Sequence, residues 1–115
     1  MHELSLAQEI VRMVEGAAAR EHFARVATLK LEAGALAGVE VAALRFALEA
    51  ITPGTCLEGA AIDIDEPAGR AYCNTCAAEV AIDYRTAPCP VCDAYPLKLL
   101  QGDALRVLDL VVVDE

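Results

Sequence analysis

The sequence predicts an α+β fold, in which two helices pack on a small three-stranded sheet and a β-rich domain that carries four cysteines is inserted. Two observations predict this class. Segments with apolar residues at helical spacing alternate with segments of period-two alternation along residues 1–66. Four of the five cysteines and four of the five prolines then fall within residues 67–102. We therefore expect residues 1–66 together with 103–115 to form one domain, and residues 67–102 to form the inserted one.

A first helix is predicted by the apolar residues that recur at helical spacing between residues 6 and 18. Ser5, followed three residues later by Gln8, is typical of a capping box and places the start of the helix at Ser5. Met1, His2 and Glu3 are then expected to form a short free arm before it.

Two strands and a second helix are predicted next. Residues 27–32 alternate between apolar and polar side chains, which indicates a half-buried strand. The apolar stripe of residues 41–51 predicts a helix that ends at the turn Pro53-Gly54. Residues 60–65 alternate again and predict the second strand of the sheet.

The cysteine-rich part has only short β-prone pieces, and its core is too small to fold without a metal. The chain then ends in an apolar run, residues 105–113, which only Arg106 and Asp109 interrupt. Such runs are typical of strands that are buried on both faces. We therefore expect this last strand to rejoin the first domain in the middle of its sheet.

Two C-x2-C pairs dominate the inserted domain, Cys73 with Cys76 and Cys89 with Cys92. Such pairs can place four thiolates at the corners of a tetrahedron, as in a structural zinc site with Zn–S bonds of about 2.3 Å. The doubled spacing favours a zinc ribbon over two disulfides or a redox C-x-x-C motif. A rubredoxin-like iron site stays open, because spacing alone does not choose the metal.

Charge and composition limit the other functions. The formal net charge is −9 and Lys and Arg do not cluster, which weighs against nucleic acid as a partner. No segment approaches the roughly twenty apolar residues that span a bilayer, so no membrane insertion is expected. The acidic first residues do not resemble a secretory signal. We expect a cytoplasmic protein with reduced cysteines.

No signature of a nucleophilic enzyme, P-loop or dinucleotide site is present, so we expect a protein that is not an enzyme. His22 is expected to be a solvated residue at the end of the first helix, and Cys56 a buried free thiol. Asp63 and Asp65 alternate onto one face of a strand, and we interpret them as a solvated face rather than a cation site.

The chemistry of His2 depends on its position as the second residue of the chain. The α-amine of Met1, the His2 amide nitrogen and the His2 imidazole can close adjacent chelate rings, with the Glu3 amide or carboxylate as a fourth donor. Planar, nitrogen-rich coordination suits Ni(II) or Cu(II). From spacing alone, a frayed terminus with a chance histidine is the simpler interpretation.

Four stretches together resemble one family over the whole chain: residues 1–6 (MHELSL), 54–60 (GTCLEGA), the two cysteine pairs and 102–107 (GDALRV). This is the HypA/HybF family of hydrogenase nickel-incorporation proteins. The resemblance implies a nickel metallochaperone that passes Ni(II), with a partner GTPase of the HypB type, to the precursor of a [NiFe]-hydrogenase large subunit.

The same resemblance implies nickel on His2, with Met1 and Glu3 contributing, and zinc on the four cysteines. Glu40 matches loosely an acidic neighbour of the nickel site. Ala77 and Asp93 depart from the glycine that the family often has after each cysteine pair. We therefore expect a non-enzymatic nickel carrier with structural Zn²⁺. The alternatives are a zinc-ribbon adaptor that binds only proteins and, third, an iron redox protein.

Overall fold

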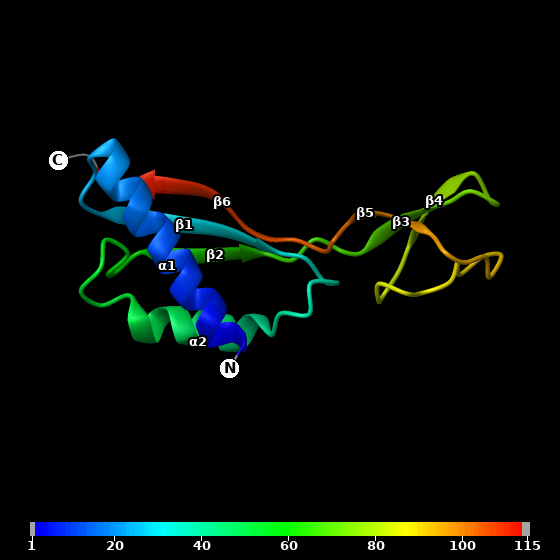
Figure 1. Cartoon of the computed structure of the whole chain (residues 1–115), viewed down its shortest axis with the longest axis horizontal. Coiled ribbons are helices and arrows are strands. Elements are labelled where there is room, and N and C mark those ends of the chain that lie inside the picture. The colour runs from blue at the N-terminus through cyan, green and yellow to red at the C-terminus, as the bar shows by residue number, and fades with distance from the viewer. Residues whose placement is uncertain (1, 114–115) are drawn as a thin grey trace. The chain divides into compact units, whose positions relative to one another are not determined.

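The computed structural model describes residues 2–113 and contains two helices and six strands within them. In chain order these are α1 (His2–Glu21), β1 (Val26–Ala33), α2 (Val41–Ile51), β2 (Ala61–Asp65), β3 (Arg70–Cys73), β4 (Ala78–Ala81), β5 (Lys98–Gln101) and β6 (Leu105–Val112). The strands form two three-stranded sheets, ordered β2-β1-β6 and β4-β3-β5 (Figure 1). The predicted α+β class is confirmed. Among residues 2–113, no helix is both long and apolar enough to cross a membrane.

The chain divides by its contacts into two compact units, which we describe separately. The helical unit comprises Met1–Leu31, Glu40–Ile64 and Val107–Glu115, and the cysteine unit comprises Glu32–Val39 and Asp65–Arg106. The segment Glu32–Val39, which precedes α2, thus belongs to the cysteine unit. From the sequence we expected it in the first domain. The reason is that Leu36 is buried in the core around the cysteines, while the Gly34 and Leu36 N–H groups donate to the carbonyls of Ala104 and Gly102.

The helical unit is built on the contact of α1 with α2, which lie on its sheet (Figure 1). The side chains that the helices and strands share as a core are aliphatic and almost inaccessible: Ala7, Ile10, Val14, Val26, Leu29, Leu31, Leu44, Ala47, Leu48 and Leu57. The predicted second helix and first two strands appear within one residue of the expected bounds. The packing therefore follows the helical and alternating patterns in the sequence.

The start of α1 differs from the prediction. The helix begins at His2, so the capping box at Ser5 and Gln8 does not form, and His2 and Glu3 are helical rather than a free arm. Two physical reasons favour the longer helix. Glu3 is an acidic residue in the first turn, where it stabilises the helix dipole, and its carboxylate accepts a hydrogen bond from the Glu40 N–H at 3.1 Å. Met1 lies outside the described residues.

The position of the last strand was also predicted wrongly. β6 is at the edge of its sheet, and β1 is the central strand. No residue of β6 is fully buried, whereas Val26, Leu29, Leu31 and Ala33 of β1 are. A strand between two neighbours is shielded on both sides, so the burial pattern follows the order of the strands rather than the composition of β6.

The cysteine unit is an antiparallel sheet with β3 in the centre. β3 pairs with β4 in the register Cys73↔Ala78, and with β5 in a register that shifts at Arg70. The buried side chains on and around this sheet are Leu36, Ala71, Cys73, Val80, Ile82, Ala87 and Cys89. Two of these seven are themselves candidate metal ligands, so the core is small and depends on the cysteines.

Candidate metal centres

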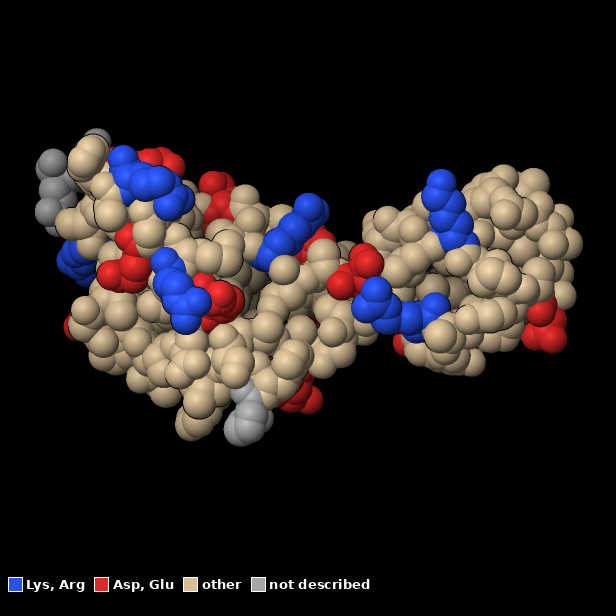
Figure 2. All heavy atoms as spheres, viewed as in Figure 1, with Lys and Arg blue, Asp and Glu red and all other residues tan. Residues whose placement is uncertain are grey.

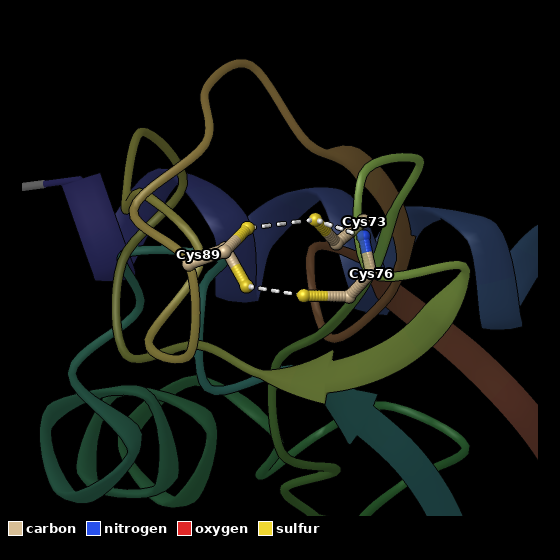
Figure 3. A group of neighbouring side chains, drawn as sticks. Cys73, Cys76 and Cys89 are labelled. Carbon is tan, nitrogen blue, oxygen red and sulfur yellow. Dashed lines mark hydrogen bonds between the residues drawn. The ribbon is translucent and has the colours of Figure 1, made fainter.

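Four sulfur atoms converge in the cysteine unit. The Sγ atoms of Cys73, Cys76, Cys89 and Cys92 all lie within 4.8 Å of one another. The Sγ atoms are 3.5 Å apart in the pair Cys73–Cys92 and 3.9 Å apart in the pair Cys76–Cys89. Figure 3 shows the labelled side chains of the first three pointing towards a common centre. Tetrahedral thiolates on zinc are about 3.8 Å apart when the Zn–S bonds are about 2.3 Å.

The backbone of each C-x2-C turn supports a sulfur. The Cys76 N–H donates to the Cys73 Sγ, and the Val91 N–H donates to the Cys89 Sγ, both at 3.4 Å. Pro90 has no N–H, but it directly follows Cys89, where the turn needs no donor. Each turn therefore places one thiolate against a backbone dipole, which is the arrangement expected for a structural metal site.

The residue that follows each turn adopts a left-handed backbone. Ala77 has φ 52° and Asp93 has φ 64°. These are the two positions where glycine was expected, and both adopt a positive φ without it. For Ala77 the Cβ atom makes this conformation unfavourable by roughly 1–2 kcal/mol, whereas Asp tolerates it better. The turn of the first cysteine pair is therefore followed by a strained residue.

The thiols of Cys76 and Cys89 have different pKa values because their surroundings differ. Hydrogen bonding with Cys92, followed by burial, raises the pKa of Cys76 to about 12. The backbone N–H groups of Cys92 and Val91 lower the pKa of Cys89 to about 7. Without a cation, one thiolate forms readily and disfavours the next. A divalent ion would offset this repulsion, and the cluster can hold a metal ion such as zinc.

The second candidate centre is the first turn of α1. The His2 side chain is 62% exposed, and its Nδ1 lies 3.6 Å from the Glu3 Oε2. The first four N–H groups of an α-helix have no acceptor within the helix, and those of His2 and Glu3 belong to this set. An imidazole and two backbone amides that have no carbonyl acceptor within the helix therefore adjoin the N-terminus. These are the donor types of a planar, nitrogen-rich site.

Glu40 lies beside this turn and is the N-cap residue of α2. Its backbone N–H donates to the Glu3 carboxylate, and this hydrogen bond is the main cause that lowers the pKa of Glu3. Its own side chain caps α2 by accepting from the Ala42 N–H at 3.2 Å. Glu40 was singled out from resemblance alone. Its capping role was missed, because Glu is not among the preferred N-cap residues and gives no sequence signal.

His22, Cys56 and the pair Asp63 and Asp65 were also considered from the sequence. His22 follows the C-terminal end of α1, some twenty residues or about 30 Å from His2 along the helix. Cys56 is a free thiol, as expected, but half-buried rather than buried, and desolvation together with Glu15 raises its pKa to about 11. Asp63 and Asp65 are exposed, as predicted for a solvated face.

Comparison with known proteins identifies one family. The profile of the family described as "Hydrogenase/urease nickel incorporation, metallochaperone, hypA" matches residues 1–112. A protein of Cupriavidus necator named hydrogenase maturation factor HypA is 60% identical over 99% of this chain and 96% of its own length. A protein of the same name from Polaromonas naphthalenivorans is 52% identical over the full length of both chains.

Solved structures agree on the fold. The solution structure of the nickel metallochaperone HypA from Helicobacter pylori matches with a TM-score of 0.69 at 17% identity, and the match covers 98% of both chains. A second structure, described as the solution structure of HypA protein, matches with a TM-score of 0.72 at 21% identity, over all of this chain and 98% of the other. At these identities the likeness supports the shared fold.

Proposed function

Because the chain belongs to the HypA family of nickel-incorporation metallochaperones, we propose that it binds Ni(II) at its N-terminus and delivers it to the precursor of a [NiFe]-hydrogenase large subunit. A GTPase of the HypB type would be its partner in this transfer, in the cytoplasm. The four cysteines would hold a structural Zn²⁺. The protein would therefore carry metal rather than catalyse a reaction.

One observation carries the nickel proposal: an exposed histidine opens a helix whose first amides are free of intrahelical hydrogen bonds. With the α-amine of Met1, the His2 amide and imidazole would give three nitrogen donors in adjacent chelate rings. Deprotonated amides carry negative charge, which the positive end of the α1 dipole stabilises. The exposed position would let the acceptor replace the donors one at a time, as delivery requires.

The role of Glu3 follows from its hydrogen bond. Its carboxylate already accepts from the Glu40 N–H at 3.1 Å, and Glu40 in turn is the N-cap residue of α2. We therefore assign the Glu3 amide, rather than the carboxylate, as the fourth donor. The carboxylate would instead fix the first turn of α1 against α2, so that the donors are held in place before nickel arrives.

Zinc in the cysteine cluster is supported by the sulfur geometry. The Sγ–Sγ distances of 3.5 Å between Cys73 and Cys92 and of 3.9 Å between Cys76 and Cys89 lie on either side of the separation of about 3.8 Å that a tetrahedral ZnS₄ centre requires. The Cys76 and Val91 N–H groups donate to two of the sulfurs, and hydrogen bonds of this kind orient the ligands of structural metal sites. An iron site would have similar geometry, and metal analysis with an absorption spectrum separates the two.

The experiment is a nickel titration of the zinc-loaded protein with its native N-terminus. We expect one Ni(II) per chain in addition to one zinc, loss of the nickel in His2→Ala, and no loss in the matched control His22→Ala. Zinc content should be the same in all three proteins. No nickel uptake, or equal uptake by His2→Ala, would favour the adaptor that binds only proteins. A coloured iron centre would favour the redox alternative.

A further inference from the structure

The two C-x2-C turns of the cysteine unit have similar backbones but different exteriors. In each turn a backbone N–H donates to the sulfur of the first cysteine, and the residue after the second cysteine has a positive φ. The first turn nevertheless exposes Asn74 and Thr75, whereas the second exposes Pro90 and Val91, with Val91 at 77%. Thr75 and Val91 occupy the same position in their turns, and both are β-branched. The turn itself therefore does not require an apolar side chain there.

Tyr95 and Pro96 extend the apolar exterior of the second turn. Tyr95 is 61% exposed, and Pro96 is exposed as well. Ala94 and Leu97, on either side of them, pack against the core of the cysteine unit. The exposed side chains thus lie outside the core, and exposed apolar and aromatic residues that a fold does not use are typical of interaction sites. We call the four residues Pro90, Val91, Tyr95 and Pro96 the second-turn surface.

The backbone that carries this surface is held by hydrogen bonds. The Cys89 N–H donates to the Ala94 carbonyl at 2.9 Å, and the Asp93 N–H donates to the Cys89 carbonyl at 2.8 Å. Zinc on Cys89 and Cys92 would fix both ends of the turn. A surface that is already ordered loses little conformational entropy on binding, and Tyr adds a large contact area with few rotatable bonds.

The charge close to the second-turn surface is negative. Asp93 is the only charged Asp, Glu, Lys or Arg from residue 86 to residue 97, and the preceding Arg85 pairs with Asp103 at 3.7 Å. Four thiolates on one Zn²⁺ would add net negative charge. Figure 2 shows that uncharged residues cover most of the visible face of the cysteine unit, at the right of the view. The complementary surface is an apolar pocket bordered by Lys or Arg.

We propose that the second-turn surface is the docking site for the protein that accepts the nickel, the precursor of the hydrogenase large subunit, which would present such a pocket. This role rests on the proposed function, from which the acceptor is taken. The nickel donors belong to the helical unit, so an acceptor that docks on the cysteine unit does not have to bind them in order to be recognised. We assign the surface to the acceptor rather than to the GTPase, because a carrier must distinguish its acceptor from other proteins before it releases the metal.

Calorimetric titration of the zinc-loaded full chain with the purified precursor tests the docking site. Val91→Thr combined with Tyr95→Ser should raise the dissociation constant by at least about tenfold, because a few anchor residues carry most of the binding energy of an interface. Thr75→Val, the reciprocal change in the first turn, is the matched control and should bind like wild type. Zinc content and backbone NMR shifts away from the substitutions should match wild type, which shows that the fold is kept.

Asp93→Asn tests the charge at constant shape, since Asn tolerates the φ of 64° as Asp does. We expect binding to weaken by about threefold at a salt concentration of about 0.15 M. The difference from wild type should disappear at about 1 M, where the screening length is about 3 Å. A difference that persists at high salt would mean that Asp93 does not act through its charge.

Three results would overturn the docking site: no binding of the precursor by wild type, equal binding by wild type and the double variant, or equal weakening by Thr75→Val. Loss of binding to the GTPase, with binding to the precursor intact, would assign the surface to the wrong partner and overturn the proposal too. Nickel titration tests the proposed function separately, because the double variant should take up nickel like wild type. If neither protein takes up nickel while the precursor binds as predicted, the nickel assignment fails and the docking site stands.

Discussion

The two units of the chain each contain a three-stranded sheet, but they fill their cores in different ways. In the helical unit large aliphatic side chains fill the core, with Leu29, Leu44 and Leu48 at 0% exposure. In the cysteine unit Cys73 and Cys89 replace part of that apolar volume. The difference indicates that burial of apolar area stabilises the helical unit, whereas the zinc that we propose would stabilise the cysteine unit. The proposed nickel donors belong to the unit whose fold needs no metal.

The largest effect is expected when the cysteine unit loses one ligand. Cys92 is exposed, so Cys92→Ala leaves no cavity and tests metal ligation alone. We expect loss of zinc and unfolding of the cysteine unit, because its apolar core is too small, while the helical unit stays folded. Backbone NMR measures both outcomes in one experiment.

Cys56→Ala is the matched control, since Cys56 is a free thiol of the helical unit. It should keep zinc and keep native shifts throughout. Native shifts from Tyr72 to Leu99 in zinc-free Cys92→Ala would show that metal does not hold this unit together.

The next effect concerns the apolar core of the helical unit. Leu48→Ala removes a side chain with no exposed surface and should lower the free energy of unfolding by about 2–5 kcal/mol. Phe46→Ala, in the same helix but at 73% exposure, should change it by no more than about 0.5 kcal/mol. Urea denaturation measures both, and zinc content should not change. Equal changes in the free energy of unfolding for the two variants would contradict the assigned role of the core. Loss of zinc from Leu48→Ala would contradict the view that the two units are stabilised separately.

A smaller, pH-dependent effect is expected at Glu15. Its carboxylate accepts from the Cys56 N–H at 2.7 Å, and this hydrogen bond lowers the pKa of Glu15 from 4.5. A lowered pKa in the folded state stabilises the protein above pH 4.5, and the contribution is lost as the pH falls through the folded value. Glu15→Gln should therefore lower the unfolding free energy at neutral pH, by less than about 1 kcal/mol because solvent screens the exposed carboxylate.

Urea midpoints at neutral pH and well below pH 4.5 check this prediction. The difference between Glu15→Gln and wild type should be largest at neutral pH and shrink in acid. A difference that does not change with pH would mean that the charge of Glu15 is not involved.

The smallest effect is expected at the left-handed residue after the first cysteine pair. Ala77→Gly relieves the unfavourable φ of 52° but raises the entropy of the unfolded chain, so the net stabilisation should be below about 1 kcal/mol. Ala78→Gly, at the start of β4, has no such strain to relieve and should destabilise instead. Thermal unfolding of the zinc-loaded proteins measures the difference. Shifts of the same sign would show that the strain at Ala77 is negligible.

Local patterns made much of this architecture predictable. Ligand spacing is set within each C-x2-C turn, so the convergence of four sulfurs could be inferred from sequence alone. The start of α1 could not, because it depends on a hydrogen bond between Glu3 and Glu40, 37 residues apart. Leu36 likewise lies in a segment predicted as a flexible connection, and only the tertiary structure places it in the core of the cysteine unit.

β6 was the clearest error, and it has a physical reason. The composition of a strand reports how apolar it is, but not whether it has one neighbour in the sheet or two. The strand is at an edge in the single chain.

The most direct test of the account adds Gly-Ser before Met1 and measures nickel binding by calorimetry. The extension converts the α-amine into an amide but deletes no side chain, so zinc content and thermal stability should stay near those of the native protein. We predict that nickel affinity falls by at least about tenfold, a loss of 1.4 kcal/mol or more in binding free energy. Equal nickel affinity for the extended and native proteins would contradict the N-terminal site.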